Sequence, residues 1–175
     1  MPDYKSLLEE ALDAWSYTRH GVVEEIENFS DAELTFKSHS QGRTPAELAF
    51  HIIESGLMMA GELSRRDGNF HRQSFAKFIQ EYAGYLRRSA EKSEIVELLK
   101  RTHAEGDRKI RAAGELMMLQ FITRFDGRPG TRLTWMHHGI AHEEYHRGQL
   151  AMYARLVGRV PALTQRIEGG RIDNL

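Results

Sequence analysis

Cysteine is absent from this 175-residue chain. Its absence excludes disulfide bonds, thiolate metal ligands and a thiol nucleophile supplied by the protein. Any thiol chemistry would require a thiol that arrives with a substrate. The nine histidines favour nitrogen and oxygen ligation at a metal site, which suits zinc, nickel, iron or manganese.

Long hydrophobic runs are missing as well. No apolar stretch approaches the roughly 20 residues that a membrane-spanning helix needs. Residues 1–5, Met-Pro-Asp-Tyr-Lys, lack the basic and then apolar layout of a signal peptide. The sequence therefore predicts a soluble, cytoplasmic protein with no membrane partner.

Neither sign of charge is in excess. The 24 Lys and Arg residues are balanced by 25 Asp and Glu residues, and the two signs are interspersed. A protein that binds a phosphate backbone normally carries a basic patch or stripe, so nucleic acid is not an expected partner. The length of 175 residues predicts a single domain over residues 1–175.

Apolar residues recur at intervals of three and four, the spacing of amphipathic helices. This spacing predicts four long helices, over residues 4–29, 44–63, 93–113 and 131–157. Thr44, Pro45 and Glu47 have the pattern of a capping box with proline in the first turn. Ser93 and Thr131 are the expected caps of the last two helices.

The other segments are expected to be short or irregular. Residues 75–86 favour a shorter helix, 117–125 fit a helix or a strand, 126–130 form a turn, and 162–175 have no regular pattern. The fold class predicted is all-α, a four-helix bundle with one or two short extra helices and a possible short strand near 117–125. Facing helices of such a bundle can build a metal site in its core.

The octet at residues 142–149, His-Glu-Glu-Tyr-His-Arg-Gly-Gln, is the most informative motif. His142 and His146 are four residues apart, so both rings project from one helix face about 6 Å apart along the axis. At that spacing both imidazoles can reach one metal ion. The alternative is a pair of ordinary core or surface histidines, but imidazoles buried without a partner would leave ring nitrogens unsatisfied.

A third ligand is expected, because catalytic metal sites usually have three protein ligands. His51, in the apolar middle of the second helix, is the best candidate; the alternative is a core histidine bonded to a neighbouring helix. His138 continues the histidine stripe, but eight residues place it ~12 Å from His146 along the axis, and each Zn–N bond is only ~2.1 Å. We therefore expect His138 to line the cavity or act on the substrate.

Further roles are predicted around the octet. Gln149 lies one turn after His146 and is expected to bond the second nitrogen of a ligand or a bound water. Tyr145 is a further candidate for lining the cavity. Gly148 is expected to permit close helix packing. Four other histidines are expected at the surface: His20, His39, His71 and His103.

The combination of Ala46-Glu-Leu-Ala-Phe-His51 with the octet resembles the DinB-like superfamily, which includes bacillithiol transferases and mycothiol-dependent maleylpyruvate isomerases. The resemblance covers roughly residues 4–160. It implies a four-helix bundle, often a homodimer, with a divalent metal held by three histidines at the positions of His51, His142 and His146. It also implies a small-molecule substrate, a low-molecular-weight thiol that is bound as thiolate and transferred to an electrophile.

The same octet also fits the His-Glu-x-x-His pattern of zinc proteases. Glu143 would then be the general base that activates a zinc-bound water, and Glu168 would be a downstream third ligand. Only 29 residues follow His146, and the mostly helical chain leaves little material for the sheet to which a protease substrate pairs. A third alternative is a non-catalytic dimeric bundle whose metal is structural or absent.

Overall fold

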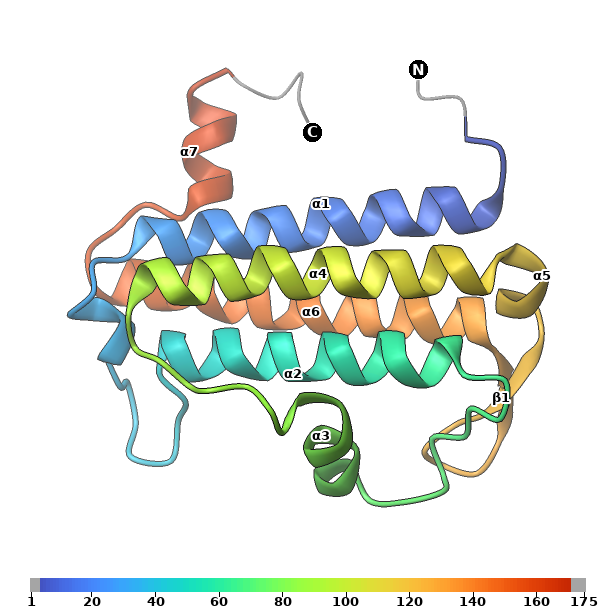
Figure 1. Ribbon diagram of the computed structural model, residues 1–175. Helices are drawn as coiled ribbons and strands as arrows, with labels where there is room; N and C mark the ends of the chain where they lie inside the picture. The colour runs from blue at the N-terminus through green and yellow to red at the C-terminus, as the bar shows by residue number, and fades with distance from the viewer. Residues whose placement is uncertain (1–3, 171–175) are drawn as a thin grey trace.

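Four long helices lie side by side in the computed structural model, which describes residues 4–170 (Figure 1). They are α1 (Leu7–Asn28), α2 (Pro45–Ser64), α4 (Lys92–Ala113) and α6 (Arg132–Leu156). Both α1 and α2 pack along α4 and α6, so that α1 lies diagonally across the bundle from α2. The predicted four-helix bundle is confirmed.

The order of helix directions gives the bundle one long crossover. In Figure 1, α1 and α6 run in one direction and α2 and α4 run in the other. The neighbours α2 and α4 are therefore parallel, and the chain between them must return along the whole bundle. Residues 65–91 make this return and include α3 (Phe75–Ala83), so the predicted shorter helix is present.

Local capping explains where α2 and α6 begin. The Thr44 hydroxyl accepts from the Glu47 amide at 3.1 Å, and the Glu47 carboxylate accepts from the Thr44 amide at 2.8 Å. This is the predicted capping box. Thr131 caps α6 by accepting from the Thr134 amide at 3.2 Å, as predicted.

The start of α4 differs from the prediction. Ser93 is inside the first turn, and the cap position is Glu91, whose side chain makes no capping hydrogen bond. A contact from another part of the chain fixes this end instead. The Lys92 ammonium donates to the Phe29 carbonyl at the end of α1, over 2.8 Å. Such a contact has no local sequence signature.

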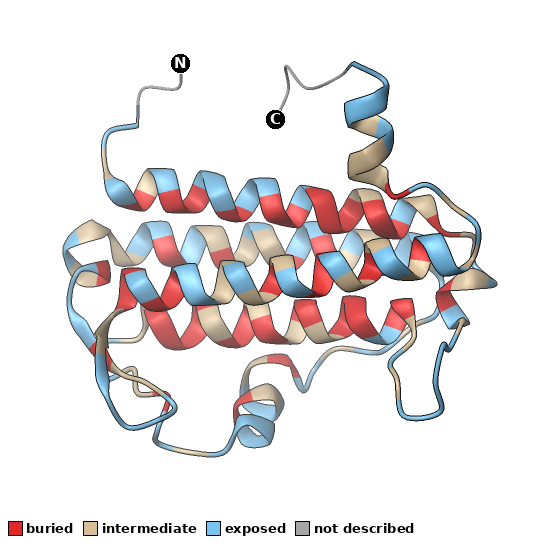
Figure 2. Cartoon of the chain, turned by 180° about the vertical axis from the view of Figure 1, so that it is seen from behind, coloured by how far each residue is buried: buried red, intermediate tan, exposed pale blue. Residues whose placement is uncertain are grey.

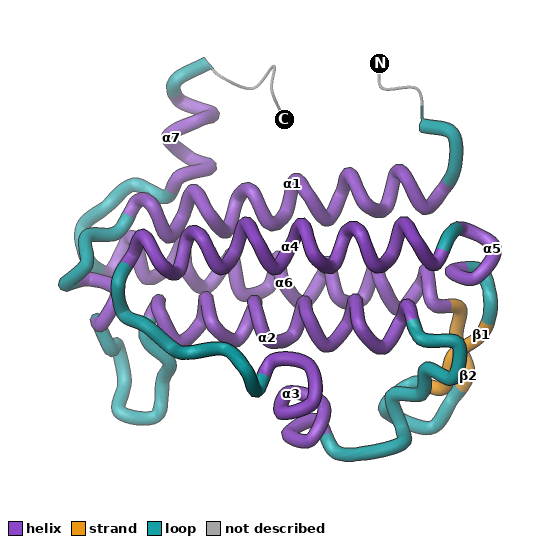
Figure 3. Tube along the Cα trace, in the orientation of Figure 1, coloured by secondary structure: helices purple, strands orange, loops and turns teal. Residues whose placement is uncertain are grey.

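The described residues contain more short elements than expected. Residues 117–125, which fitted either a helix or a strand, divide between α5 (Glu115–Met118) and β1 (Phe121–Thr123). β1 pairs antiparallel with β2 (Pro129–Thr131) around a turn in which Gly127 has a φ of 78° (Figure 3). A 3₁₀ turn, η1 (Glu33–Thr35), follows α1.

The expectation of an irregular tail over 162–175 is wrong for its first half. Residues Ala162–Glu168 form α7, which packs on α1, and residues 171–175 lie outside the described part of the chain. The Glu25 carboxylate of α1 faces the first turn of α7, where the backbone of Ala162 and Leu163 opposes the rise in the pKa of Glu25 that burial causes. An acidic side chain stabilises a helix N-terminus. This contact comes from a distant part of the sequence, so local periodicity did not reveal it.

Buried and exposed residues alternate along the long helices (Figure 2). Two apolar clusters fill the interior, one around Ile26, Ile53 and Leu99 and the other around Trp15, Phe70 and Phe78. Between residues 4 and 170, no helix is long and apolar enough to span a membrane.

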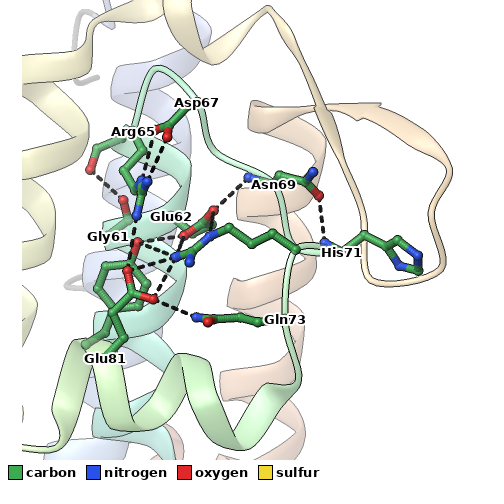
Figure 4. A network of polar contacts seen from close by, with 11 residues as sticks. Gly61, Glu62, Arg65, Asp67, Asn69, His71, Gln73 and Glu81 are labelled. Atoms are coloured by element: carbon green, nitrogen blue, oxygen red, sulfur yellow. Dashed lines mark hydrogen bonds and ion pairs between the residues drawn. The ribbon is translucent and has the colours of Figure 1, made fainter.

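Glu62 on α2 attaches the crossover to the bundle (Figure 4). Its side chain is fully buried and accepts from Arg72 at 2.8 and 3.0 Å, from the Tyr82 hydroxyl at 2.6 Å and from the Asn69 amide at 2.7 Å. These bonds hold the pKa of Glu62 below its ordinary value although burial alone would raise it. Arg72 also pairs with Glu81 on α3 at 2.8 Å.

Candidate metal centre

His142 and His146 lie one turn apart on α6, and their Nε2 atoms are 3.1 Å apart. The rings meet edge to face with centroids 4.5 Å apart. His146 is buried and His142 half-buried, so both rings point into the space between α6 and α2. The helical spacing that the sequence indicated therefore places the two imidazoles as expected.

His51 reaches the same point from the middle of α2. Its Nε2 atom is 3.3 Å from the Nε2 atom of His142, and its ring centroid is 4.7 Å from that of His146. One ring nitrogen from each of the three histidines lies within 4.8 Å of the others. The structure thus brings together the three residues that the sequence singled out as candidate ligands.

The spacing of these nitrogens fits a common cation. Two nitrogens that are each ~2.1 Å from one ion are ~3.0 Å apart at a right angle and ~3.4 Å apart at the tetrahedral angle. The observed separations of 3.1 and 3.3 Å lie within that range. Two of the three nitrogen pairs therefore have the spacing that a shared divalent metal requires.

Gln149 fixes the ring of His146, as the sequence suggested. Its Oε1 atom lies 2.8 Å from Nδ1 of His146, so Nδ1 carries the proton and donates it. Nε2 is then left with a free lone pair directed at His142. A metal-binding histidine usually donates its other ring nitrogen to a neighbour in this way.

All three histidines are kept neutral at pH 7. Burial, followed by the positive charge of Arg43, lowers the pKa of His51 to about 3. Burial and the neighbouring His146 lower the pKa of His142 to about 4, and burial also lowers the pKa of His146. Metal ligation requires the unprotonated ring, so the lowered pKa values keep the three rings in the form that binds a metal ion.

The Glu143 carboxylate is bonded to two residues of α1. This buried group is bonded to the Nε atom of Arg19, lies 3.0 Å from the Arg19 Nη2 atom and accepts from the Trp15 indole at 3.0 Å. A carboxylate with these fixed partners is not placed to activate a water on the histidine cluster. This geometry opposes the zinc-protease interpretation.

Glu168, the other residue proposed for that interpretation, also lies outside the cluster. Glu168 belongs to α7, which packs on α1, and the third nitrogen comes from His51 instead. Arg147, the residue after His146, pairs with Glu144 at 3.0 Å.

His138 and Tyr145 lie near the three histidines but are not among the candidate ligands. The exposed His138 ring stacks on Trp135 with centroids 4.4 Å apart, and it lines a cavity that also reaches His142. Tyr145 is 65% exposed and meets the His146 ring edge to face at 5.1 Å. Tyr145 does not line this cavity, because its side chain projects outward from α6.

His103 is the one of the four expected surface histidines that is not exposed. His20, His39 and His71 are exposed as expected, whereas His103 is half-buried against Trp15, with ring centroids 4.6 Å apart. Its Nε2 atom has no hydrogen-bond partner among the described residues. Burial lowers the pKa of His103 to about 4. The polar neighbours of His103 in the sequence concealed this inward orientation.

Arg19 was not recognised as a partner of the octet. It occupies the buried stripe of α1 beside Thr18 and Val22, where a charged residue interrupts an apolar face. That interruption was a usable signal, because a charge on the buried face of a helix almost always has a partner.

The sequence model of the DinB superfamily matches residues 14–150, a span that contains all three candidate ligands. The chain belongs to the DinB superfamily. No curated protein sequence matches it significantly.

Solved DinB-like structures share the fold. YfiT from Bacillus subtilis is described as a probable metal-dependent hydrolase with an unusual four-helix bundle topology. It is 14% identical to this chain with a TM-score of 0.67, and the match covers 91% of this chain and 94% of YfiT. A DinB-like protein from Bacillus cereus is 16% identical with a TM-score of 0.67, over 87% and 94% of the two chains. A second Bacillus subtilis DinB-like protein is 18% identical with a TM-score of 0.66, over 86% and 93%.

Proposed function

We propose that this DinB-superfamily protein is a divalent-metal-dependent enzyme in which His51, His142 and His146 hold the ion. The observation that carries the proposal is the convergence of three Nε2 atoms. The Nε2 atom of His142 is 3.1 Å from that of His146 and 3.3 Å from that of His51. Zinc or nickel is the proposed ion. Iron and manganese are the alternatives, because imidazole also binds these two metals.

The number of ligands supports catalysis over a purely structural metal. Within residues 4–170, the cluster of ligating side chains has three members. Structural zinc sites are usually closed by four protein ligands, whereas catalytic sites keep one position for water or substrate. A site with three histidines therefore favours an enzyme over the non-catalytic bundle.

Thiol transfer is the reaction that this chain supports best. When bound, a divalent cation lowers the pKa of a thiol or water at its open position. Glu143 is held by Arg19 and Trp15, so it is not available as the base of a His-Glu-x-x-His hydrolase. A low-molecular-weight thiol that loses its proton on binding needs no such base. We therefore propose that the thiolate, after its proton passes to solvent, forms a carbon–sulfur bond with an electrophile, which either expels a leaving group or, at an activated double bond, takes up a proton.

Positive charge beside the site supports an anionic ligand. Arg43, in the loop before α2, lowers the pKa of His51, His142 and His146 in addition to the effect of burial. Its guanidinium has no hydrogen bond or ion pair in the described part of the chain, whereas Arg88 is paired with Glu54 at 2.8 Å. Arg43 is thus available to stabilise an anion at the metal. His138, which lines the cavity that reaches His142, is the proposed substrate contact, whereas Gln149 acts through the ring of His146 and Tyr145 lies outside the cavity.

Metal analysis tests the proposal directly. Protein purified without an affinity tag or added metal is expected to contain close to one divalent cation per chain. His51→Ala is expected to remove most of it, while His20→Ala, a change at an exposed histidine, retains it. A zinc protease that used only the octet and Glu168 would keep its ion after His51→Ala. A fully folded and active preparation without metal would refute the proposal.

Hydrolysis is the second candidate, favoured by the description of YfiT as a probable metal-dependent hydrolase. A screen of thiols against a panel of electrophiles with metal-loaded protein separates the two reactions. Turnover that requires the thiol supports transfer, and turnover without a thiol supports hydrolysis. The homodimer that the family resemblance implies remains a prediction, which light scattering on the same preparation tests.

A further inference from the structure

A cavity lies beside the candidate ligand His142; α2 and α6 supply most of its wall, and residues of α1, α3 and α4 complete it. Its volume is about 150 Å³, and His142 forms part of its wall. Phe75 of α3 lines the same cavity and lies 6.4 Å from the His51 ring, measured between centroids. The metal centre and the cavity therefore share a boundary.

The wall of this cavity is mainly apolar. Its apolar side chains include Met58, Met59, Phe75, Phe125, Met136 and Ile140. Methionine side chains are flexible and polarizable, so they adapt to ligands of irregular shape and make favourable contacts with aromatic rings. The wall favours an apolar ligand, and an aromatic one in particular.

The polar groups of the wall are mostly satisfied by the protein itself. The Ser55 hydroxyl donates to the His51 carbonyl at 2.6 Å, and the Glu143 carboxylate is bonded to Arg19 and Trp15. His142 faces the metal centre, and His138, whose ring stacks on Trp135, is the remaining polar side chain of the wall. A ligand group inside the cavity would therefore find few partners for its own hydrogen bonds.

The volume limits the size of the ligand group. An apolar cavity of ~150 Å³ in another protein remains dry and accepts benzene. Pockets that enclose a drug-sized molecule are larger, about 300–1,000 Å³. The cavity beside His142 thus suits one ring or one short branched alkyl chain.

We propose that this cavity binds the apolar group of the molecule whose sulfur or oxygen occupies the open position of the metal. The preferred ligand carries a single aromatic ring or a short branched alkyl chain attached close to its reactive atom. This specificity rests on the proposed function, whereas binding of a free ring in the cavity does not. The two can therefore be tested separately.

The first experiment uses metal-free protein and fluorobenzene, followed by fluorine NMR. Fluorobenzene is expected to bind saturably to the wild-type chain. Ile140→Trp on α6 and Met59→Trp on α2 fill the cavity from two sides, and each is expected to weaken binding at least tenfold. Leu116→Trp, at a position 83% exposed on α5, is the control and retains wild-type affinity. Circular dichroism selects the variants that fold.

Absence of saturable binding to the wild-type chain would overturn the proposal. Unchanged affinity in a folded filling variant would also overturn it. Neither result depends on metal, so failure of the cavity and failure of the metal centre remain distinguishable.

The second experiment places the ring relative to the metal. Paramagnetic Co²⁺ bound at the three histidines is expected to increase the fluorine relaxation rate of bound fluorobenzene several-fold over the Zn²⁺-loaded protein. An unchanged rate in cobalt-loaded protein would put the ring elsewhere and overturn the proposal. Failure of Co²⁺ to bind would count against the metal centre and leave the result with metal-free protein standing.

The third experiment measures specificity with two thiols, and their affinities are compared after correction for the lower pKa of phenylmethanethiol. Zn²⁺-loaded protein is expected to bind phenylmethanethiol at least tenfold more tightly than ethanethiol, and Ile140→Trp is expected to abolish this preference. Equal affinities in the wild-type protein, or a preference that survives in Ile140→Trp, would overturn the assignment of the cavity to the metal-bound molecule.

Discussion

Arg19 of α1 and Glu143 of α6 form a buried ion pair directly behind the candidate ligand His142. Arg19 also donates to the Leu99 carbonyl of α4 at 2.9 Å, so one guanidinium connects three of the four long helices. The pair fixes the turn of α6 that carries His142. It also removes from the site the carboxylate that a His-Glu-x-x-His hydrolase would use.

Removing either partner of this pair is expected to destabilise the protein strongly. Arg19→Met leaves a buried carboxylate without its cation, and such a change typically costs about 3–5 kcal/mol. The double variant Arg19→Met/Glu143→Leu is expected to recover part of the loss, because no unpaired charge remains. Urea unfolding of metal-free protein measures the free energy of unfolding of the wild type, the single variant and the double variant.

The control for this prediction is the exposed pair between Lys100 and Glu27, which also joins α1 to α4, over 3.2 Å. Both of its side chains are about half exposed, at 56% and 49%. Lys100→Met is expected to change stability by less than about 1 kcal/mol. Equal losses for Lys100→Met and Arg19→Met would contradict the role of burial.

Gln149 is expected to tune metal affinity through the ring of His146. Gln149→Leu removes the acceptor of the Nδ1 proton and is predicted to weaken zinc binding about 10- to 100-fold. Gln149→Glu retains an oxygen acceptor at the same place and is predicted to bind zinc at least as tightly as wild type. Competition with a chromophoric chelator measures both. Wild-type affinity in Gln149→Leu would exclude this role for the amide.

The crossover is expected to depend on Glu62. Glu62→Gln leaves Arg72 without its buried counter-charge and is predicted to cost about 3 kcal/mol of unfolding free energy. Glu81→Gln removes the more exposed carboxylate of the same network and is predicted to cost about 1 kcal/mol or less. Hydrogen exchange should become faster mainly over residues 65–83. A similar loss for both variants would show that the burial of Glu62 is unimportant.

His103 is expected to make stability depend on pH. Its pKa is about 4 in the folded protein and ~6.5 in the unfolded chain, so the unfolded chain binds the proton first as pH falls. Its contribution is complete above pH ~6.5, is lost as pH falls toward ~4, and amounts to about 3 kcal/mol.

The ligand histidines also have lowered pKa values, so the effect of His103 must be measured as a difference. His103→Phe keeps an aromatic ring beside Trp15 and removes the titrating group. The variant should lose less stability than wild type between pH 7 and pH 4 in urea titrations of metal-free protein. Identical losses would show that His103 does not titrate as its burial implies.

Local sequence patterns predicted the elements whose causes are local. The capping box at Thr44 and the cap at Thr131 were both foreseen, and the histidine spacing on α6 placed two rings on one face. The missed features depend on contacts between distant segments. Three such contacts join residues far apart in the chain: Lys92 with Phe29, Glu25 with the start of α7, and Arg19 with Glu143. Periodicity within one helix carries no information about such partners.

Gly148 corrects a packing expectation and provides the last prediction. A Cβ atom at Gly148 would meet no described atom within 4 Å, so this glycine does not serve close helix packing. Gly21 of α1 is different, because a Cβ atom there would lie 2.2 Å from the Arg147 guanidinium carbon. Arg147 is buried and also lies over the Tyr17 ring, with 5.5 Å to the ring centroid.

Alanine should therefore have opposite effects at the two glycines. Gly148→Ala is expected to stabilise the protein by about 0.5–1 kcal/mol. Alanine reduces the backbone freedom of the unfolded chain, and the helix has room for its methyl group at this position. Gly21→Ala gains the same helix propensity but must displace Arg147, and is expected to destabilise by about 1–3 kcal/mol. Thermal and urea unfolding of metal-free protein compare the two variants. Stabilisation by both would mean that Arg147 moves aside without cost, and destabilisation by Gly148→Ala would mean that its surroundings are not open in solution.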